Sequence, residues 1–271
     1  MRLAFIGSGV MGEAIIAAVL QGGLAQPTHV TACDVVPQRR EHLSQAYGIV
    51  TAEQAADAIA GSDLIVLAVK PQEFPTVTRD LRGKLATGQT AVSIMAGVGL
   101  AALREGLGHE AIVRAMPNTP AQVGEGMTVW TATDAVSAAA RENVHLILGA
   151  LGQELYVAEE KYLDMATAVS GSGPAFVFLM MEAMVDAAVH IGLRREMATE
   201  MVLQTVLGSA RYAQASGRHL ADLRNQVTSP GGTTAEGLLA LEEAGVRAAF
   251  AQAIIAAYER ARHLGGAASK P

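Results

Sequence analysis

The feature that most constrains the fold is a glycine pattern directly behind the first apolar run. Leu3–Ile6 is expected to form a buried strand, and Gly7-Ser8-Gly9-Val10-Met11-Gly12 follows it with the spacing G-x-G-x-x-G, at the start of a helical run over Val10–Leu20. In this context the first glycine permits a tight turn, the second admits a pyrophosphate to the backbone, and the third allows close helix–strand packing. The segment predicts a dinucleotide-binding turn; an ordinary glycine-rich turn is the alternative.

Short apolar runs alternate with amphipathic stretches over residues 1–161. Strands that alternate with helices imply right-handed crossovers between parallel strands. The predicted fold class is therefore α/β, with a Rossmann-type doubly wound parallel sheet, and 1–161 is the expected dinucleotide-binding domain. Further strands are expected at Val30–Cys33, Leu64–Val69, Ala91–Ile94 and Ala111–Ala115, and a polar helix at Pro37–Ala46.

Residues 162–271 are expected to form an all-helical domain. Phe176, Leu179, Met180 and Ala183 recur at helical spacing, and the β-type runs disappear. The stretch Ala175–Val189 is apolar on more than one face, so it needs burial on all sides. A second subunit is the simplest cover, and we expect at least a homodimer.

Composition and charge exclude several classes of protein. The net charge is −6, which disfavours nucleic-acid binding. Cys33 is the single cysteine, and the seven histidines are scattered, so neither a disulfide nor a metal site is expected. We also expect no secretory signal and no membrane span, because Glu182 and Asp186 interrupt the most apolar stretch, Ala175–Met181. The expected location is cytoplasmic.

Asp34 lies at the end of the second expected strand, about 20 residues after Gly12. A carboxylate there accepts hydrogen bonds from the ribose hydroxyls of NAD, and it repels a 2′-phosphate unless Arg39 or Arg40 offsets its charge. The alternative is a helix N-cap near Pro37. The choice between NADH and NADPH therefore stays open.

A second anion site is expected at Ser229-Pro230-Gly231-Gly232-Thr233-Thr234. This stretch precedes a helical run over Ala235–Glu243, so its N–H groups lack helical partners. Two glycines allow the backbone to wrap around a small anion, which predicts a site for a substrate carboxylate. A helix start without a ligand is the alternative.

Three other segments have both a binding and a structural interpretation. Val69-Lys70-Pro71 ends a strand at the carboxyl edge of the sheet, where ligands of such sheets bind, or Pro71 simply ends the strand. Met116–Pro120 is a stiff loop that either frames the cofactor or is purely structural. Ser170–Pro174 opens a helix and is expected mainly to pack closely beside the site.

Together these segments resemble the pyrroline-5-carboxylate reductase family over essentially the whole chain. The resemblance implies reduction of 1-pyrroline-5-carboxylate to proline by NADPH or NADH, a helical substrate and dimerisation domain, and a permitted decamer of five dimers. It implies that Thr234 is the catalytic residue, bonding the substrate ring nitrogen. The matching segments are Phe5–Gly12, Ala68–Pro71, Arg114–Pro120, Ser170–Ala175 and Thr228–Thr234. The implied substrate-binding residues are Ser229, Gly231, Gly232, Thr233 and Thr234; the implied cofactor-binding residues are Ile6, Gly7, Ser8, Gly9, Val10, Met11, Asp34, Ala68, Val69, Lys70, Pro71, Ala96, Pro117 and Asn118.

Two rival interpretations remain at this point. A β-hydroxyacid dehydrogenase shares the glycine-rich start. Enzymes of that family resemble one another in having a Gly-Ser-Gly helix start that is soon followed by a catalytic lysine. Here Gly171-Ser172-Gly173 is followed by no lysine before Arg194. A non-catalytic nucleotide sensor explains the first motif but leaves the Ser229–Thr234 site without a purpose.

Overall fold

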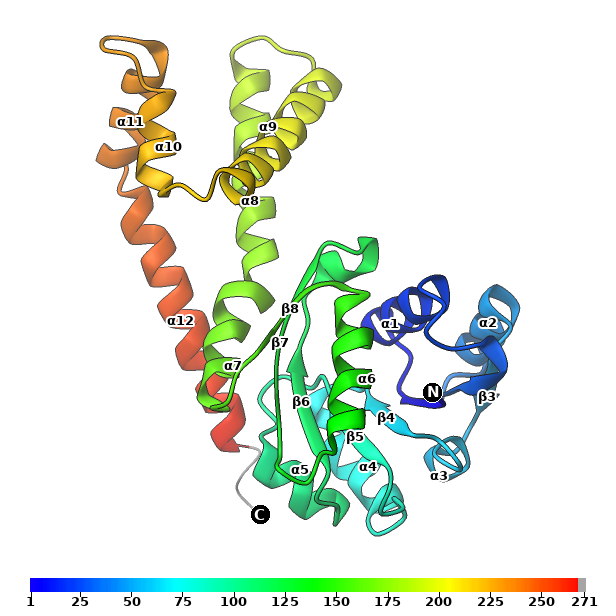
Figure 1. Cartoon of the computed structure of the whole chain (residues 1–271). Coiled ribbons are helices and arrows are strands. Elements are labelled where there is room, and N and C mark those ends of the chain that lie inside the picture. Colours follow the sequence, from blue (N-terminus) through cyan, green and yellow to red (C-terminus); the bar gives the residue numbers. More distant parts are fainter. Residues whose placement is uncertain (268–271) are drawn as a thin grey trace. The chain divides into compact units, whose positions relative to one another are not determined.

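The computed structural model describes residues 1–267. Contacts divide the chain into two compact units (Figure 1). The sheet unit comprises Met1–Ser172 and the chain from Ala256 onward, and the helical unit is Gly173–Ile255. The domain ranges 1–161 and 162–271 expected from the sequence stay a prediction, because a division by contacts does not establish which segments fold independently.

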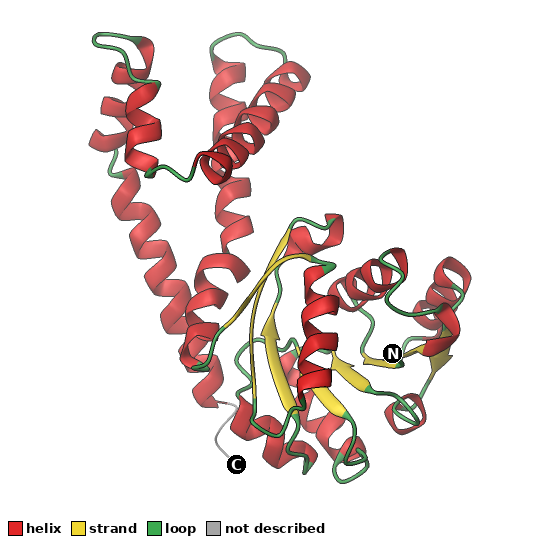
Figure 2. Ribbon diagram, in the orientation of Figure 1, coloured by secondary structure: helices red, strands yellow, loops and turns green. Residues whose placement is uncertain are grey.

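One eight-stranded sheet runs through the sheet unit (Figure 2). Its strand order is β3-β2-β1-β4-β5-β6-β7-β8, so the chain reverses direction across the sheet between β1 and β4. This is the doubly wound topology in which ligands bind at the carboxyl ends of the strands beside the reversal, and the predicted fold class is confirmed. The strands are β1 Leu3–Ile6, β2 Val30–Cys33, β3 Val50–Ala52, β4 Leu64–Leu67, β5 Thr90–Ser93, β6 Ile112–Met116, β7 Gly126–Ala132 and β8 Gly152–Tyr156.

The sheet departs from the predicted parallel order at one junction, because β7 pairs antiparallel with β6, and β8, which pairs parallel with β7, shares its reversed direction. All other pairs are parallel. A short 3-10 helix, Thr119–Val123, returns the chain so that β7 runs back beside β6. A crossover helix would have kept the two strands parallel.

Helices cover both faces of the sheet, as the alternating pattern predicted. The first starts at Val10 with glycine, not a polar side chain, as its N-cap, and no side chain caps it. The helices of this unit are α1 Val10–Gln21, α2 Pro37–Tyr47, α3 Ala55–Ala58, α4 Phe74–Leu81, α5 Leu100–Leu107, α6 Ala138–Gly149 and α7 Lys161–Ala166.

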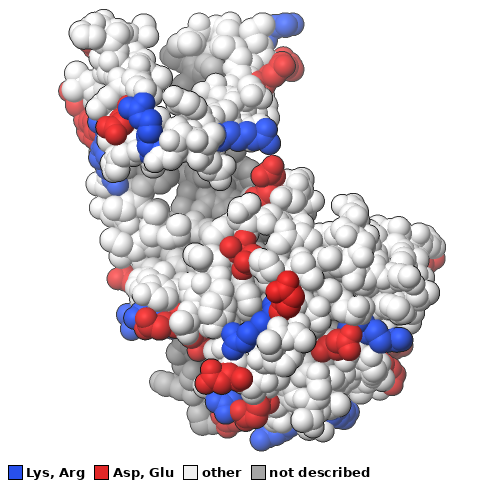
Figure 3. All heavy atoms as spheres, viewed as in Figure 1, with Lys and Arg blue, Asp and Glu red and all other residues white. Residues whose placement is uncertain are grey.

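The helical unit contains little apolar core of its own. Val185, Ala198 and Val202 form its buried cluster among the described residues. Large apolar side chains such as Phe178 and Leu179 stay 58% and 66% exposed. Much of the molecular surface drawn in Figure 3 carries no charged side chain. Its helices are α8 Gly173–His190, α9 Arg195–Ser216, α10 Leu220–Gln226, α11 Thr233–Glu243 and the first part of α12 Val246–Ala267.

A π-helical turn, Thr167–Gly171, joins α7 to α8 in one helical run from Lys161 to His190. This run has 30 residues and a mean hydropathy of 1.4 in its most apolar window, so by length and composition alone it is able to cross a membrane. Only 11% of that window is buried within the chain. The expectation that the protein has no membrane span therefore stays a prediction.

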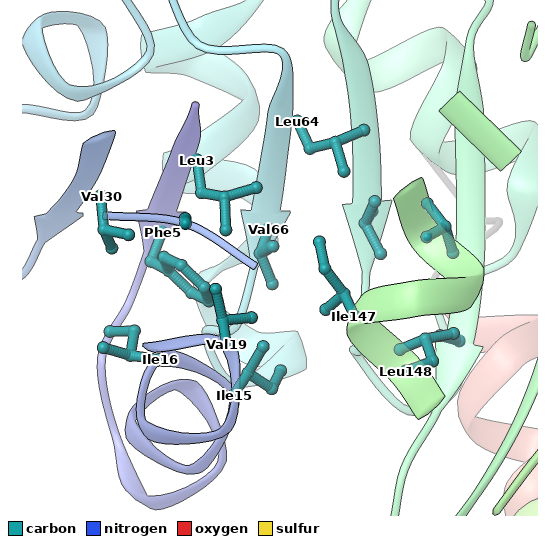
Figure 4. Packing of buried hydrophobic residues seen from close by; sticks show 14 of the residues in the cluster. Leu3, Phe5, Ile15, Ile16, Val19, Val30, Leu64, Val66, Ile147 and Leu148 are labelled. Atoms are coloured by element: carbon teal, nitrogen blue, oxygen red, sulfur yellow. The ribbon is translucent and has the colours of Figure 1, made fainter. Parts of the chain in front are cut away.

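The core of the sheet unit lies in two layers, one on each face of the sheet. Side chains alternate along β1, so that Leu3 and Phe5 belong to one buried cluster and Ala4 and Ile6 to the other. Figure 4 shows the first layer, with α1 packed beneath Phe5. Burial of one such phenylalanine contributes about 2–3 kcal/mol to stability. This packing fixes the end of β1, where the glycine motif begins.

Candidate functional site

The glycine motif forms the turn between β1 and α1. Gly7 has a φ of +84°, and a Cβ added there would lie 2.7 Å from Val69 Cγ1. The N–H of Gly7 donates to the carbonyl of Cys33 at 2.9 Å, which joins the turn to the end of β2. Only glycine combines this conformation with this close approach.

The other two glycines of the motif have opposite surroundings. Nothing lies within 4 Å of a Cβ added at Gly9, the N-cap of α1. A Cβ at Gly12 would lie 2.9 Å from the carbonyl oxygen of Gly7 and 3.3 Å from the Cβ of Ala68. Gly9 therefore leaves the backbone open to a ligand at an uncapped helix start, whereas Gly12 permits close packing of α1 on the sheet.

Asp34 holds the glycine turn from the end of β2. Its Oδ2 accepts hydrogen bonds from the N–H and the hydroxyl of Ser8, at 3.0 and 2.8 Å. Its Oδ1 accepts from the N–H of Val36 at 3.0 Å. Val36 itself is the N-cap of α2 and has no side-chain cap, so Asp34 is not the N-cap of that helix. The carboxylate instead joins the turn to β2 and lines the adjoining cavity.

A cavity of about 550 Å³ opens beside the turn. This volume lies within the range of small-molecule sites, roughly 300–1,000 Å³. Its position at the carboxyl ends of β1, β2 and β4 is the expected binding edge of the sheet. Eight of the predicted cofactor residues line it: Ile6, Gly7, Ser8, Gly9, Asp34, Ala68, Val69 and Lys70.

The sequence analysis missed a second group of lining residues. Glu53–Ala56 follow β3, a strand of only three residues, none of them fully buried, that gave no apolar signal. Cys33 and Val35 flank Asp34 at the end of β2. The rest follow β4 on α4 and its flanks, where their own spacing forms no motif. The missed residues are Cys33, Val35, Glu53, Gln54, Ala55, Ala56, Glu73, Thr76, Val77, Asp80 and Lys84.

Six predicted cofactor residues do not line this cavity. Among them, Asn118 is 9% exposed, and both ends of its amide bond the protein itself. Its Nδ2 donates to the carbonyl of Ser170 at 3.0 Å, and its Oδ1 accepts from the N–H of Met127 at 2.9 Å. These bonds favour a structural role for this loop. The six residues are Val10, Met11, Pro71, Ala96, Pro117 and Asn118.

The Ser229–Thr234 segment of the helical unit forms a tight turn at the start of α11. Gly231 has a φ of +64°, and the N–H of Gly232 donates to the carbonyl of Ser229 at 3.1 Å. Gly232 is the N-cap of α11, and no side chain caps the helix. The segment is largely exposed, with Thr234 half-buried. An uncapped helix start with adjacent hydroxyls suits a carboxylate ligand.

Comparison with known proteins covers both units. A family model described as pyrroline-5-carboxylate reductase dimerisation matches residues 160–264, and one described as NADP oxidoreductase coenzyme F420-dependent matches residues 2–97. A pyrroline-5-carboxylate reductase from Synechocystis is 40% identical over 98% of both chains. The chain belongs to the pyrroline-5-carboxylate reductase family. The resemblance expected from the sequence is thereby confirmed.

Solved structures of the pyrroline-5-carboxylate reductase family share the whole fold. The Coxiella burnetii enzyme is 34% identical with a TM-score of 0.89, over 97% of this chain and 98% of that one. The Plasmodium falciparum enzyme, with NADP bound, is 31% identical with a TM-score of 0.89, over 98% of both chains. The β-hydroxyacid dehydrogenase interpretation is therefore not retained.

Within the family motif at Arg114–Pro120, the structure adds an ionic cluster around a buried arginine, which sequence reasoning missed. The Arg114 side chain is 5% exposed and pairs with Glu160 at 2.9 Å and with Asp164 at 2.8 Å. Glu160 also accepts the N–H of Leu100 at 2.7 Å, at the start of α5. The cluster ties β6, α5 and α7 together beside the loop that contains Ala96.

The residues at the glycine turn fit a dinucleotide. The open backbone at Gly9, the uncapped α1 and the carboxylate of Asp34 are the donor and acceptor groups that a pyrophosphate and a ribose require. Cys33 lies beside them but is not a nucleophile, because burial, reinforced by the charge of Asp34, raises the pKa of its thiol to about 11.

Proposed function

We propose that this protein is a pyrroline-5-carboxylate reductase that converts 1-pyrroline-5-carboxylate and NADPH or NADH into proline and the oxidised coenzyme. The observation that carries the proposal is 40% identity over 98% of the chain to a reductase of that name. The turn at Gly7–Gly12 and the turn at Ser229–Thr234 supply, in addition, two uncapped helix starts for two anionic ligands.

The glycine turn binds the coenzyme in this proposal. The N–H groups at the start of α1 bind the pyrophosphate, and Asp34 accepts the ribose hydroxyls. The reduced nicotinamide, when bound, supplies the hydride. The protein's contribution is to orient the two reactants and to exclude water between them.

The turn before α11 binds the substrate. Backbone N–H groups of Gly231, Thr233 and Thr234 and the hydroxyls of Ser229 and Thr233 hold the carboxylate, and Thr234 bonds the ring nitrogen. Gly232, whose own N–H is bonded to Ser229, lets the turn close around the ligand. A cyclic imine is able to bind in its protonated form, and the site then needs no strong general acid. That requirement fits a segment built from hydroxyl and amide donors, without histidine or lysine.

The helical unit is the dimer interface in this proposal. Its exposed apolar side chains, and the long apolar run Lys161–His190, need cover that the chain itself does not supply. The family model that matches residues 160–264 is that of a dimerisation domain. This match favours a second copy of the chain, and not a membrane, as the partner that buries the apolar side chains. A decamer of five dimers and a cytoplasmic location belong to the same proposal.

The direct test is oxidation of NADH and NADPH, measured separately by absorbance, with purified protein and 1-pyrroline-5-carboxylate. Substrate-dependent oxidation and formation of proline support the proposal. A folded protein that binds coenzyme but oxidises neither form would contradict it, and the nucleotide-sensor interpretation would replace it.

Thr234 gives a sharper test of the substrate turn. Thr234→Ala should lower kcat/KM for the imine about tenfold or more, since it removes a hydrogen bond to a charged group, while the KM for coenzyme stays unchanged. Thr205→Ala is the matched control: its hydroxyl bonds the carbonyl of Met201 within α9. An unaltered rate in the Thr234 variant would refute its assigned role.

A further inference from the structure

The cavity beside the glycine turn has an acidic side. Asp34 and Glu53, which follow β2 and β3, both line it. The other lining residues at the ends of these two strands include no lysine or arginine. The lining lysines, Lys70 and Lys84, come from the segment that follows β4. Because β1 lies between β2 and β4 in the sheet, these lysines belong to the other side of the cavity.

Two arginines of α2 lie near Asp34, and both are already engaged. Arg39 donates through Nε to the carbonyl of Ser8 at 2.6 Å, and its Nη2 pairs with Glu13. Arg40 donates through Nη1 to the carbonyl of Asp34 at 2.7 Å, and its Nη2 lies 3.5 Å from the carboxylate of Glu53. Neither arginine lines the cavity, and both guanidiniums are held by oxygen atoms of the protein.

Glu13 is held in place by several donors at once. Besides Arg39, it is bonded by Nε2 of His42 at 2.9 Å and by the hydroxyl of Tyr47 at 3.0 Å. Burial alone would raise the pKa of Glu13, but the bonds from His42, Arg39 and Tyr47 outweigh it and lower the pKa. The carboxylate therefore stays ionised at neutral pH and keeps its pairing with Arg39.

We infer that this cavity selects a coenzyme with a free 2′-hydroxyl, NADH, over one with a 2′-phosphate, and that Glu13 contributes to this selectivity as a positioning residue that keeps Arg39 away from the ribose. The inference rests on the proposed function, which puts the adenosine ribose at Asp34. A hydroxyl donates to Asp34, whereas a phosphate meets the negative charge of Asp34, and the nearby Arg40 is already bonded to the Asp34 carbonyl and paired with Glu53.

The first experiment compares dissociation constants of the wild-type protein for NADH and NADPH, without substrate, from the fluorescence of the reduced nicotinamide. NADH should bind at least about tenfold more tightly, since like charges brought together in a site are strongly unfavourable. NADPH binding as tight as that of NADH would overturn the inference alone. Binding of neither coenzyme would overturn the proposed coenzyme site and the inference with it.

Variants then locate the selectivity. Glu13→Gln removes the ion pair that holds Nη2 of Arg39, and it should shift the ratio of NADPH to NADH affinity about tenfold toward NADPH, the scale of one charge-assisted hydrogen bond. Glu13→Asp keeps the charge and should keep the ratio. Glu41→Gln, on an exposed part of α2 where the carboxylate bonds Gln45, is the matched control. A merely structural role of Glu13 lowers both affinities equally, and that result would overturn its assignment.

Asp34→Ser tests the other half of the inference. The variant loses the ribose acceptor and the repulsion of a phosphate together, so the affinity ratio should move toward NADPH by about tenfold or more. Asp34 also supports Ser8, and loss of that support weakens both coenzymes alike. An unmoved ratio would therefore overturn the role of Asp34 in selectivity.

Discussion

The sheet unit buries Phe5, Leu67 and Leu103 completely within its own chain, whereas the helical unit leaves Phe178 and Leu179 mostly exposed. Both units are rich in apolar residues, so the difference does not arise from composition. A sheet with helices on each face encloses two layers of side chains. Paired helices without a third layer enclose almost no side chains, so their stability has to come from packing against a second copy of the chain.

The difference also separates the two turns proposed to bind ligands. The glycine turn is fixed by β1, β2 and α1, all packed within the sheet unit. The Ser229–Thr234 turn begins α11, a helix with no buried residue in the single chain. Coenzyme binding should therefore depend on the fold of one chain, and substrate binding on association as well.

The largest expected effect is a charge in the helical unit. Leu179→Glu places a carboxylate on the exposed apolar side of α8, and a two-fold interface repeats it. An unpaired charge buried at an interface costs about 3 kcal/mol or more, so the dimer should weaken by more than about a hundredfold. Sedimentation at several protein concentrations measures the change.

Leu146→Glu is the matched control for this charge. Leu146 lies on α6 of the sheet unit and is 40% exposed. Its variant should keep the association state of the wild-type protein. If Leu179→Glu leaves the dimer intact while the control behaves as expected, the proposed interface does not include this part of α8.

The next effect concerns the core of the sheet unit. Phe5 is fully buried among the side chains of α1 (Figure 4), and Phe5→Ala should lower the free energy of unfolding by about 3–5 kcal/mol. Because this core lies within one chain, the loss should be the same at every protein concentration. Phe178→Ala, in the helical unit, should lower stability by an amount that depends on concentration. Denaturant unfolding at two concentrations distinguishes these behaviours, and identical behaviour would contradict the comparison.

The sequence predicted the parts of the fold whose signal is local. Short, mostly apolar runs marked β1, β2, β4, β5 and β6, because strands covered on both faces need them. The β3 and β8 strands were missed because one is very short and the other leaves Leu155 and Tyr156 exposed. The antiparallel β7 was missed because a return through a 3-10 helix leaves no periodic pattern.

The same distinction applies to the candidate site. Spacing in the chain predicted the turns at Gly7–Gly12 and Ser229–Thr234, because a turn and the helix behind it are local. The pairings of Asp34 with Ser8 and of Arg39 with Glu13 join residues 26 positions apart. Such pairings depend on how the strands and helices pack, which no local pattern encodes.

A smaller effect separates binding from folding within the sheet unit. Gly12→Ala brings a methyl group against Gly7 and should cost about 1–3 kcal/mol of stability. Gly9→Ala adds a methyl group in open space, so its cost should be limited to the poorer N-cap preference of alanine, about 0.5–1 kcal/mol. The Gly9 variant should nevertheless bind NADH more weakly, because the methyl group stands where the pyrophosphate approaches. Thermal unfolding and NADH titration of both variants test this, and equal losses of stability would contradict it.

The smallest expected effect is a change of stability with pH that arises from Cys33. Because Cys33 is the single cysteine and lies in the sheet unit, this effect concerns that unit alone. Burial raises the pKa of its thiol from 9.0 to about 11, so the unfolded chain ionises first as the pH rises. The stabilising contribution is thus fully present below pH 9.0 and is lost between there and about 11. Near the middle of that window the loss should reach about 1 kcal/mol.

Cys33→Ala removes this dependence while leaving other groups that titrate at high pH. The difference in stability between the wild-type protein and the variant should therefore shift in favour of the variant as the pH rises. Unfolding curves at pH values below and within the window measure it.

Thiol-labelling of native wild-type protein at the lower pH should be slow, since the reactive form is the thiolate and the side chain is 5% exposed. If Leu179→Glu also leaves that rate unchanged, the sheet unit keeps its fold without the dimer; faster labelling would mean that its core depends on association too.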